Sequence, residues 1–288
     1  MNSIYKHSNT TASLWFVGFP LMLIAAPILA LAYAALDRYN PIIYLTFLGL
    51  FGMYLAFTFL FEKAAKLSHC RNAKAVVFMG VIVGLWTLYC SWVCFVWILS
   101  EYEHFLLTKP QTLWEVMNAL AEEGLWSIGR GSSENVTGIL LQIVWVVEAL
   151  IIMAAAIFSS MSALNNEVYC EACGYWNKNL KTKHKAGLRL SSTQDVELTR
   201  QALTEDINLL AQLPYAESYE NPHMLIRTTL CPRCQKHATA SIFKVSYVKK
   251  DEKEEVKIKQ ITAPIILSKE GINAMQQKTA EMPSDRNF

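Results

Sequence analysis

The chain has 288 residues, of which 53% are hydrophobic and 17% are charged. An ordinary water-soluble domain is less apolar than this, and the apolar residues are concentrated before residue 161. The formal net charge of +2 is too small to indicate a protein that binds nucleic acid through its overall charge.

Four apolar runs, each long enough to cross about 30 Å of hydrocarbon, predict membrane-spanning helices. They lie at residues 14–36, 41–61, 75–99 and 138–160. The first run could instead be a cleaved signal peptide, because Lys6 precedes it and Ala30-Leu-Ala32 resembles a small-residue cleavage site. The run continues to Leu36 and is long enough to span, which favours a transmembrane helix.

Basic residues near the ends of the runs predict their orientation. Loop 62–74 carries four basic residues against one acid, whereas loop 100–136 carries two basic residues against six acids. The positive-inside rule therefore assigns loop 62–74 to the cytoplasm. An even number of spans then puts both termini, and everything after residue 161, on the cytoplasmic side of a plasma (bacterial inner) membrane.

The external loop 100–136 is too long to be a simple connection. Thr112-Leu-Trp-Glu115 matches the capping box that begins a helix, and Gly124 is a plausible end. Apolar residues recur at helical spacing from within the box onward, namely Leu113, Val116, Met117 and Leu120. The loop is therefore predicted to contain a short amphipathic helix at the outer interface.

Glu148 lies in the middle of the fourth run, where an ionised carboxylate is costly. Because no basic residue lies in the other runs, we expect a protonated carboxyl group that is hydrogen-bonded to Tyr89, Ser91 or Thr87. Gln142 adds a second intramembrane polar group. A structural or assembly role is favoured, with a proton or ion pathway and a small-molecule contact as the alternatives.

The third run contains two features that concern packing. Gly80-Val-Ile-Val-Gly84 is a small-xxx-small pattern that lets helices approach closely. Contacts within one chain are favoured over contacts between chains, so a homo-oligomer remains an alternative. Cys90 and Cys94 share a helix face, and without an intramembrane His they are more typical of apolar packing than of a metal site.

Two Cys pairs lie in the polar C-terminal segment, Cys170-Glu-Ala-Cys173 and Cys231-Pro-Arg-Cys234. Each C-x-x-C turn can present two thiolates to one ion, so two turns complete a tetrahedral site of four sulfurs. A reducing cytosol keeps thiols free for metal, which favours structural Zn²⁺ over disulfides. An iron site or a redox-active dithiol is the alternative.

The segments Cys170–Gly174 and Cys231–Cys234 resemble the two knuckles of a zinc ribbon, and the resemblance covers only these turns and their flanking strands. It implies a small cytoplasmic α+β zinc-ribbon-like domain, placed at 161–275 and followed by a flexible tail at 276–288. The 57 residues between the pairs exceed the interval of a compact ribbon, and an apolar stripe predicts an inserted helix at about 193–212. Alternating patterns predict strands at 224–229, 238–249 and 255–263.

A basic run follows the first knuckle and consists of Lys178, Lys181, Lys183, Lys185 and Arg189. It starts fewer than 20 residues after the fourth apolar run, so anionic lipid headgroups are its favoured partner. A plain solvated face is the next interpretation. Nucleic acid is a third and less favoured partner, because residues 161–288 hold 18 basic against 15 acidic residues.

These features predict a four-helix transmembrane bundle followed by the zinc-ribbon-like domain. No complete catalytic constellation is found in the sequence, so a non-enzymatic function is favoured. The first hypothesis is an interaction or scaffold subunit of a membrane assembly that presents the zinc domain to a cytoplasmic protein partner. The alternative is a transporter, channel subunit or membrane enzyme that uses Glu148, and thiol or metal sensing is a third hypothesis.

Overall fold

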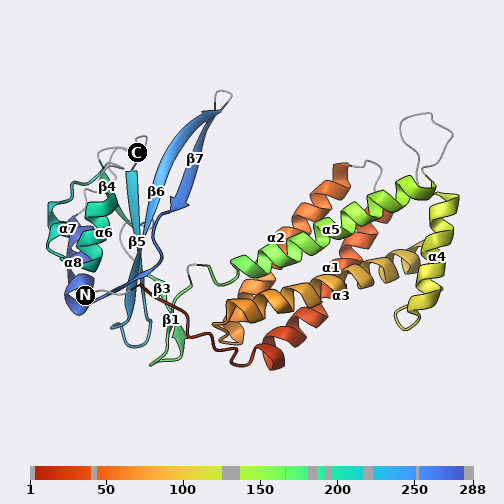
Figure 1. Ribbon diagram of the computed structural model, residues 1–288, viewed down its shortest axis with the longest axis horizontal. Coiled ribbons are helices and arrows are strands. Elements are labelled where there is room, and N and C mark those ends of the chain that lie inside the picture. The colour runs from red at the N-terminus through yellow and green to blue at the C-terminus, as the bar shows by residue number, and fades with distance from the viewer. Residues whose placement is uncertain are drawn as a thin grey trace. The chain divides into compact units, whose positions relative to one another are not determined.

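The computed structural model describes residues 4–39, 44–124, 137–165, 167–180, 187–191, 196–216, 223–250 and 253–281. The chain forms two compact units (Figure 1). The helical unit comprises Ser8–Asn165. The C-terminal unit joins Met1–His7 to Asn166–Phe288.

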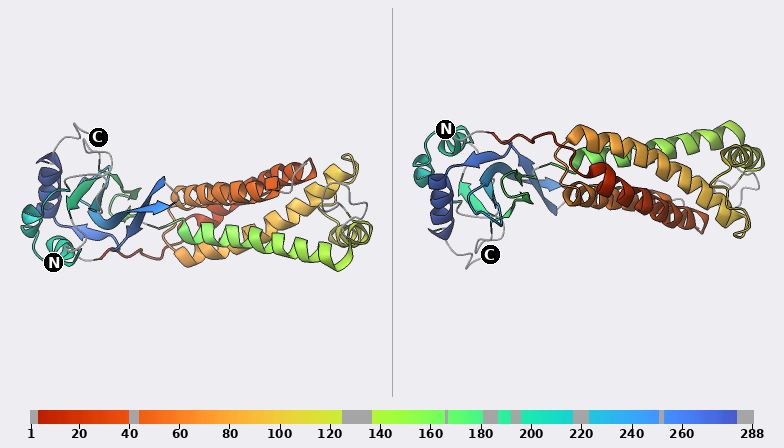
Figure 2. Two further views of the ribbon diagram at one scale, coloured as in Figure 1. Left: turned by 90° about the horizontal axis from the view of Figure 1, so that it is seen from above. Right: turned by 90° about the horizontal axis from the view of Figure 1, so that it is seen from below.

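Among its described residues, the helical unit contains four helices that are long and apolar enough to cross a membrane, and they run side by side (Figure 2). These are α1 (Phe19–Arg38), α2 (Tyr44–Leu67), α3 (Ala73–Leu99) and α5 (Gly138–Ser162). A π-helical turn, η1 (Leu14–Gly18), leads into α1, and the shorter helix α4 (Pro110–Glu123) lies between α3 and α5 in the sequence.

Helix α2 continues six residues beyond the predicted end of its apolar run at residue 61. Its last turns contain charged residues, and Lys66 Nζ lies 2.8 Å from Glu62 Oε1 in an i,i+4 ion pair. Ala64 and Ala65 in the same turns are fully buried. The hydropathy pattern ends the predicted span at the first charged residues. The helix continues beyond them because its backbone hydrogen bonds do not require apolar side chains.

Helix α3 packs against both α1 and α5, and α2 packs against α5 and α1. The two glycines of α3 bring it close to α5. A Cβ atom at Gly80 would lie 2.7 Å from Ser160 Cβ, and one at Gly84 would lie 3.1 Å from Ala156 Cβ. The prediction that this small-residue pattern serves contacts within the chain is confirmed.

The outward sides of the long helices are apolar. Ile24 of α1, Leu48 of α2 and Leu150 of α5 are each more than 60% exposed. A water-soluble monomer rarely exposes large contiguous apolar surfaces. Such surfaces suit helices whose outer sides contact lipid.

Helix α4 begins at Pro110, two residues before the predicted capping box. Lys109 is the N-cap residue, its side chain makes no capping hydrogen bond, and Pro110 stands at the first helical position, where its missing N–H group has no cost. The predicted amphipathic character is borne out by the buried Leu113, which packs with Val93 and Val96 of α3. The end at Glu123, just before Gly124, agrees with the prediction.

The C-terminal unit contains a two-stranded and a six-stranded sheet, both antiparallel. In the small sheet β1 (Tyr169–Cys170) pairs with β2 (Tyr175–Trp176). The large sheet has the order β3-β5-β6-β7, while β4 also pairs with β5 and β8 with β6. Its strands are β3 (Lys178–Asn179), β4 (Leu188–Ser191), β5 (His223–Leu230), β6 (Ala238–Lys250), β7 (Lys253–Gln260) and β8 (Ile265–Leu267).

Three helices cover one face of the large sheet (Figure 1): α6 (Val196–Thr204), α7 (Leu209–Gln212) and α8 (Lys269–Glu281). Alternate residues of the strands point into this core, including Met224, Ile226 and Ile242, which are fully buried. Leu203 of α6 and Met275 of α8 pack against them from the helical layer. The unit is therefore a separate α+β domain.

Two sequence predictions for this domain differ from the structure. The single inserted helix at 193–212 is instead α6 and α7, because Asp206 Oδ1 accepts hydrogen bonds from the backbone and side-chain N–H groups of Asn208 and turns the chain between them. The predicted N-terminal residues 193–195 lie outside the described residues. The tail expected to be flexible from residue 276 is helical to Glu281, because α8 buries Met275 and Thr279.

The N-terminal residues also belong to this domain, which the sequence pattern did not indicate. Ile4 forms an antiparallel bridge with Ile265, and the Tyr5 backbone N–H donates to the Pro264 carbonyl (2.8 Å). The chain therefore leaves the C-terminal domain, runs through the helical unit and returns to the same domain.

Candidate metal centre

The first Cys pair lies on the tight turn between β1 and β2. The backbone N–H groups of Cys173 and Gly174 both donate to the Cys170 carbonyl, at 3.2 and 2.9 Å. Gly174 has a φ of +69°, a left-handed conformation that glycine adopts without steric cost. This turn places the two Cys side chains on one side of the hairpin.

The second Cys pair follows β5 and forms a turn of the same kind. The Gln235 N–H donates to the Cys231 carbonyl (3.1 Å), and the Cys231 N–H donates to the His237 carbonyl (2.8 Å). The backbone N–H of Lys236 lies 3.5 Å from Cys234 Sγ. Gln235 occupies the position of Gly174 and has a φ of +53°.

The two turns bring four sulfur atoms together. Those of Cys170, Cys173, Cys231 and Cys234 all lie within 4.8 Å of one another, and Cys170 Sγ is 3.9 Å from Cys234 Sγ. Zn–S bonds of about 2.3 Å in a regular tetrahedron place the sulfurs roughly 3.8 Å apart. The donor set and its spacing therefore fit a metal ion with four thiolate ligands.

The four thiols differ in exposure and in pKa. Cys170 and Cys231 are buried, whereas Cys173 and Cys234 are partly exposed. Backbone N–H groups of Lys236 and His237 lower the pKa of Cys234 to about 6, and burial raises the pKa of Cys170 to about 12. A divalent cation among the sulfurs would favour the thiolate at every position.

Asn177 links the two turns through hydrogen bonds. Its backbone N–H donates to the Val168 carbonyl (2.7 Å), before the first turn. Its side-chain Nδ2 donates to the carbonyl of His237 (3.2 Å), after the second turn. This residue follows the first Cys pair by only four positions, yet its role depends on chain folding that its sequence neighbours do not reveal.

The N-terminal segment supports the first turn. The Tyr5 hydroxyl oxygen accepts a hydrogen bond from the backbone N–H of Tyr169 (3.1 Å), next to Cys170. The Tyr5 ring also lies edge-to-face with His237, with 6.3 Å between centroids. Tyr5 therefore contacts residues next to both cysteine turns, although it precedes Tyr169 by 164 positions in the sequence.

Gln235 has a left-handed backbone conformation in the second turn, and this conformation predicts an effect of substitution on stability. Replacing the exposed Gln235 with Gly removes the steric cost of its positive φ, so Gln235→Gly should stabilise the domain by about 1 kcal/mol. The measurement is the free energy of opening of β5 and β6 from amide hydrogen exchange of the full-length protein. Lys236→Gly is the matched control, since its φ is not positive, and it should destabilise the domain slightly; stabilisation by both variants would contradict the reasoning.

In the helical unit, Glu148 is only partly buried, and its Oε1 accepts a hydrogen bond from the Tyr33 hydroxyl of α1 (2.8 Å). The partners expected from sequence were wrong. Tyr89 donates to the Leu107 carbonyl, and Ser91 and Thr87 donate to carbonyls of their own helix. Residues of α3 were expected as partners because they lie at a similar depth in the predicted membrane. The Tyr33 side chain reaches Glu148 from α1 instead.

Other predicted residues are not part of one site. Gln142 is exposed near the start of α5. Cys90 and Cys94 of α3 are buried, and Cys94 packs among apolar residues. Of the basic run, Lys178 lies in β3 and Arg189 in β4. Lys181, Lys183 and Lys185 lie outside the described residues.

The chain was compared with protein-family models, with curated proteins and with solved structures. None of the three comparisons found a match.

Proposed function

We propose that the chain is an integral membrane protein that presents a structural zinc domain to the cytoplasm, as an interaction or scaffold subunit of a membrane assembly. The convergence of the four cysteine sulfurs within 4.8 Å is the observation that carries this proposal. Four thiolates complete the tetrahedral coordination of Zn²⁺ and leave no open position for substrate. Such a site stabilises a fold rather than performs a reaction.

The position of the cysteines in the fold supports a structural role. Cys170 lies in the β1–β2 hairpin, which belongs to a different sheet from β5, the strand that leads to Cys231. A metal ion held by both turns would join these two sheets. The domain would then offer a rigid surface to a cytoplasmic protein partner.

The four apolar helices support insertion in the membrane, and their exposed outer sides suit lipid contact. Residues 4 and 5 pair with β8 and the loop before it, so both ends of the helical unit lead into one domain. Four spans return the chain to its starting side, which agrees with this pairing. The basic segment 62–74 and the positive-inside rule favour the cytoplasm for that side.

Crosslinking in native membranes followed by mass spectrometry tests the scaffold function. A partner that crosslinks to the wild-type domain should be lost in Cys231→Ser. It should be retained in Pro232→Ala, which changes an exposed residue of the same turn and leaves all four thiols in place. An unchanged set of crosslinked proteins in Cys231→Ser would overturn the scaffold proposal.

A second candidate is a transporter, channel subunit or membrane enzyme that uses Glu148. The hydrogen bond from Tyr33 is the specific observation, because it holds a carboxyl group between two helices of the bundle. The same bond also serves a purely structural role. Substitution of Glu148 distinguishes the proton or ion role from the purely structural role.

Glu148→Gln keeps an oxygen that can accept the Tyr33 hydrogen bond but removes the titrating group. In the structural role, thermal unfolding of the detergent-solubilised protein should be almost unchanged in Glu148→Gln. Tyr33→Phe, which removes the donor, should destabilise the bundle by about 1 kcal/mol. Loss of cellular function in a Glu148→Gln protein of normal stability would instead favour the proton or ion role.

A further inference from the structure

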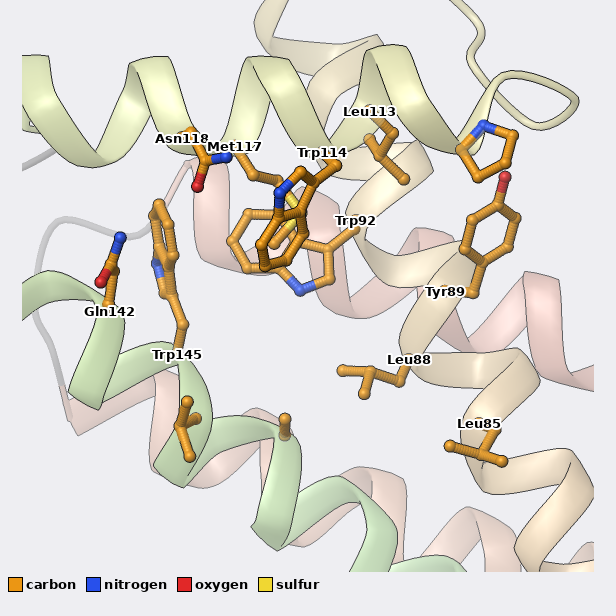
Figure 3. Close-up of a pocket in the computed structure, with 13 residues that line it drawn as sticks. Leu85, Leu88, Tyr89, Trp92, Leu113, Trp114, Met117, Asn118, Gln142 and Trp145 are labelled. Atoms are coloured by element: carbon orange, nitrogen blue, oxygen red, sulfur yellow. The ribbon is translucent and has the colours of Figure 1, made fainter.

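A pocket of about 580 Å³ lies between α3, α4 and α5 (Figure 3). Its volume is within the range of pockets that hold small organic ligands. Helix α4 forms one wall because Leu113 anchors it to Val93 and Val96 of α3. The pocket is therefore a consequence of the amphipathic helix in the loop.

The walls of the pocket are mainly apolar and aromatic. Leu85 and Leu88 of α3 line one end, and Trp92 and Trp145 meet edge-to-face with 4.8 Å between ring centroids. Among the described residues, no charged side chain lines the pocket. A charged ligand group would lose its hydration there without gaining a counter-charge.

Two side-chain amides lie at the other end of the pocket. Figure 3 shows Asn118 of α4 and Gln142 of α5 beside Trp145, away from Leu85 and Leu88. Within the described part of the chain, neither side-chain amide forms a hydrogen bond. Each amide can both donate and accept, so together they suit a hydroxyl or carbonyl group.

The polar and apolar ends also lie at different depths along α5. Gln142 is four residues after the start of the helix, or about 6 Å along its axis, and Ala149 at the apolar end is about 16 Å along it. In a bilayer with a hydrocarbon core of about 30 Å, these depths correspond to the headgroup boundary and the middle of the membrane. The pocket thus has the polarity of a lipid that stands in one leaflet.

We propose that this pocket binds an uncharged lipid with a hydroxyl or ester head group, of the diacylglycerol class. The head group hydrogen-bonds to Asn118 and Gln142, and an acyl chain lies between Leu85, Leu88 and Trp92. The inference rests on the proposed membrane insertion of the helices and is independent of the metal domain.

The probes are a photoactivatable diacylglycerol and a photoactivatable phosphatidylglycerol, an anionic lipid of similar chain length. Each is added at the same mole fraction to nanodiscs that contain the full-length protein, and labelled residues are identified by mass spectrometry. The diacylglycerol probe should label segments 85–92, 113–118 and 142–149 at least fivefold more than the anionic probe. Equal labelling by both probes would show that only bulk lipid enters the pocket, and would overturn the proposal.

Two pocket variants test whether the polar and the apolar end of the pocket both contribute to lipid binding. Asn118→Leu combined with Gln142→Leu removes the polar contacts at similar side-chain size and should reduce diacylglycerol labelling roughly tenfold, the loss expected for two hydrogen bonds. Ala149→Leu narrows the apolar end and should also reduce labelling while both amides remain. Thermal unfolding of each variant shows whether the bundle is intact, and unchanged labelling in both variants would contradict the proposal.

Two controls separate this inference from the proposed function. Val147→Leu alters an exposed side chain of α5 outside the pocket lining and should label like the wild type. Cys231→Ser should also leave the lipid labelling unchanged, because its effect is confined to the C-terminal domain. Loss of lipid labelling in Cys231→Ser would contradict the independence of the pocket.

Discussion

Cys231→Ser is expected to unfold the C-terminal domain while leaving the helical unit folded. Cys231 is fully buried just after β5, and its sulfur belongs to the four-sulfur cluster through which a bound metal ion would join the two sheets. Structural zinc contributes roughly 10–16 kcal/mol of apparent binding free energy at pH 7, which is comparable with the whole stability of a typical domain of about 5–15 kcal/mol. Hydrogen–deuterium exchange of the full-length protein should show β5, β6 and β8 losing protection, with α1, α3 and α5 unchanged.

Two variants serve as controls for this result. Cys94→Ser changes another buried cysteine, one that lies outside the sulfur cluster, and should leave exchange in the C-terminal domain as in the wild type. Pro232→Ala should do the same, because it keeps all four thiols. Wild-type protection of β5 in Cys231→Ser would mean that the cysteine cluster does not stabilise the domain.

Gly80→Val is expected to give the largest destabilisation in the helical unit. Even the Cβ atom of the new side chain would lie 2.7 Å from Ser160 Cβ, well inside normal contact distance, so α3 and α5 must separate. Overpacking of a well-packed core typically costs 1–3 kcal/mol, and we expect about 3 kcal/mol because the obstacle is the short, inflexible side chain of Ser160. Thermal unfolding of the detergent-solubilised protein measures this loss.

Gly52→Val in α2 is the matched control, because a Cβ atom there would have no neighbouring atom within 4 Å. It adds the same side chain to another glycine in a long apolar helix and should change stability by less than about 1 kcal/mol. Equal destabilisation by the two substitutions would show that α3 and α5 do not approach each other closely at Gly80.

The parts of the fold that follow from local sequence could be predicted. The long helices follow from uninterrupted apolar runs, and Gly80 and Gly84 indicate a close helix contact because only small residues permit it. The two cysteine turns could be recognised because C-x-x-C spacing is itself the geometry of the site. Hydropathy could not show where α2 ends, since an ion pair such as Glu62–Lys66 extends a helix beyond its apolar part.

The parts that depend on distant segments could not be predicted. Tyr5 approaches the first cysteine turn only because the N-terminal segment pairs beside β8, and no pattern in residues 4–7 indicates this. Tyr33 was missed as the partner of Glu148 for the same reason, since helix order in the bundle decides which hydroxyl reaches the carboxyl group. A tyrosine in an apolar run is a weak signal, because it is usually interpreted as an interfacial anchor.

We propose that Cys170, Cys173, Cys231 and Cys234 hold one zinc ion. The most direct test of this proposal is elemental analysis combined with X-ray absorption spectroscopy of the full-length protein, purified in detergent without added metal or chelator. We expect one zinc per chain, surrounded by four sulfur atoms at about 2.3 Å. Protein with no bound metal, or with a zinc ion bound through nitrogen and oxygen atoms instead of sulfur, would contradict it.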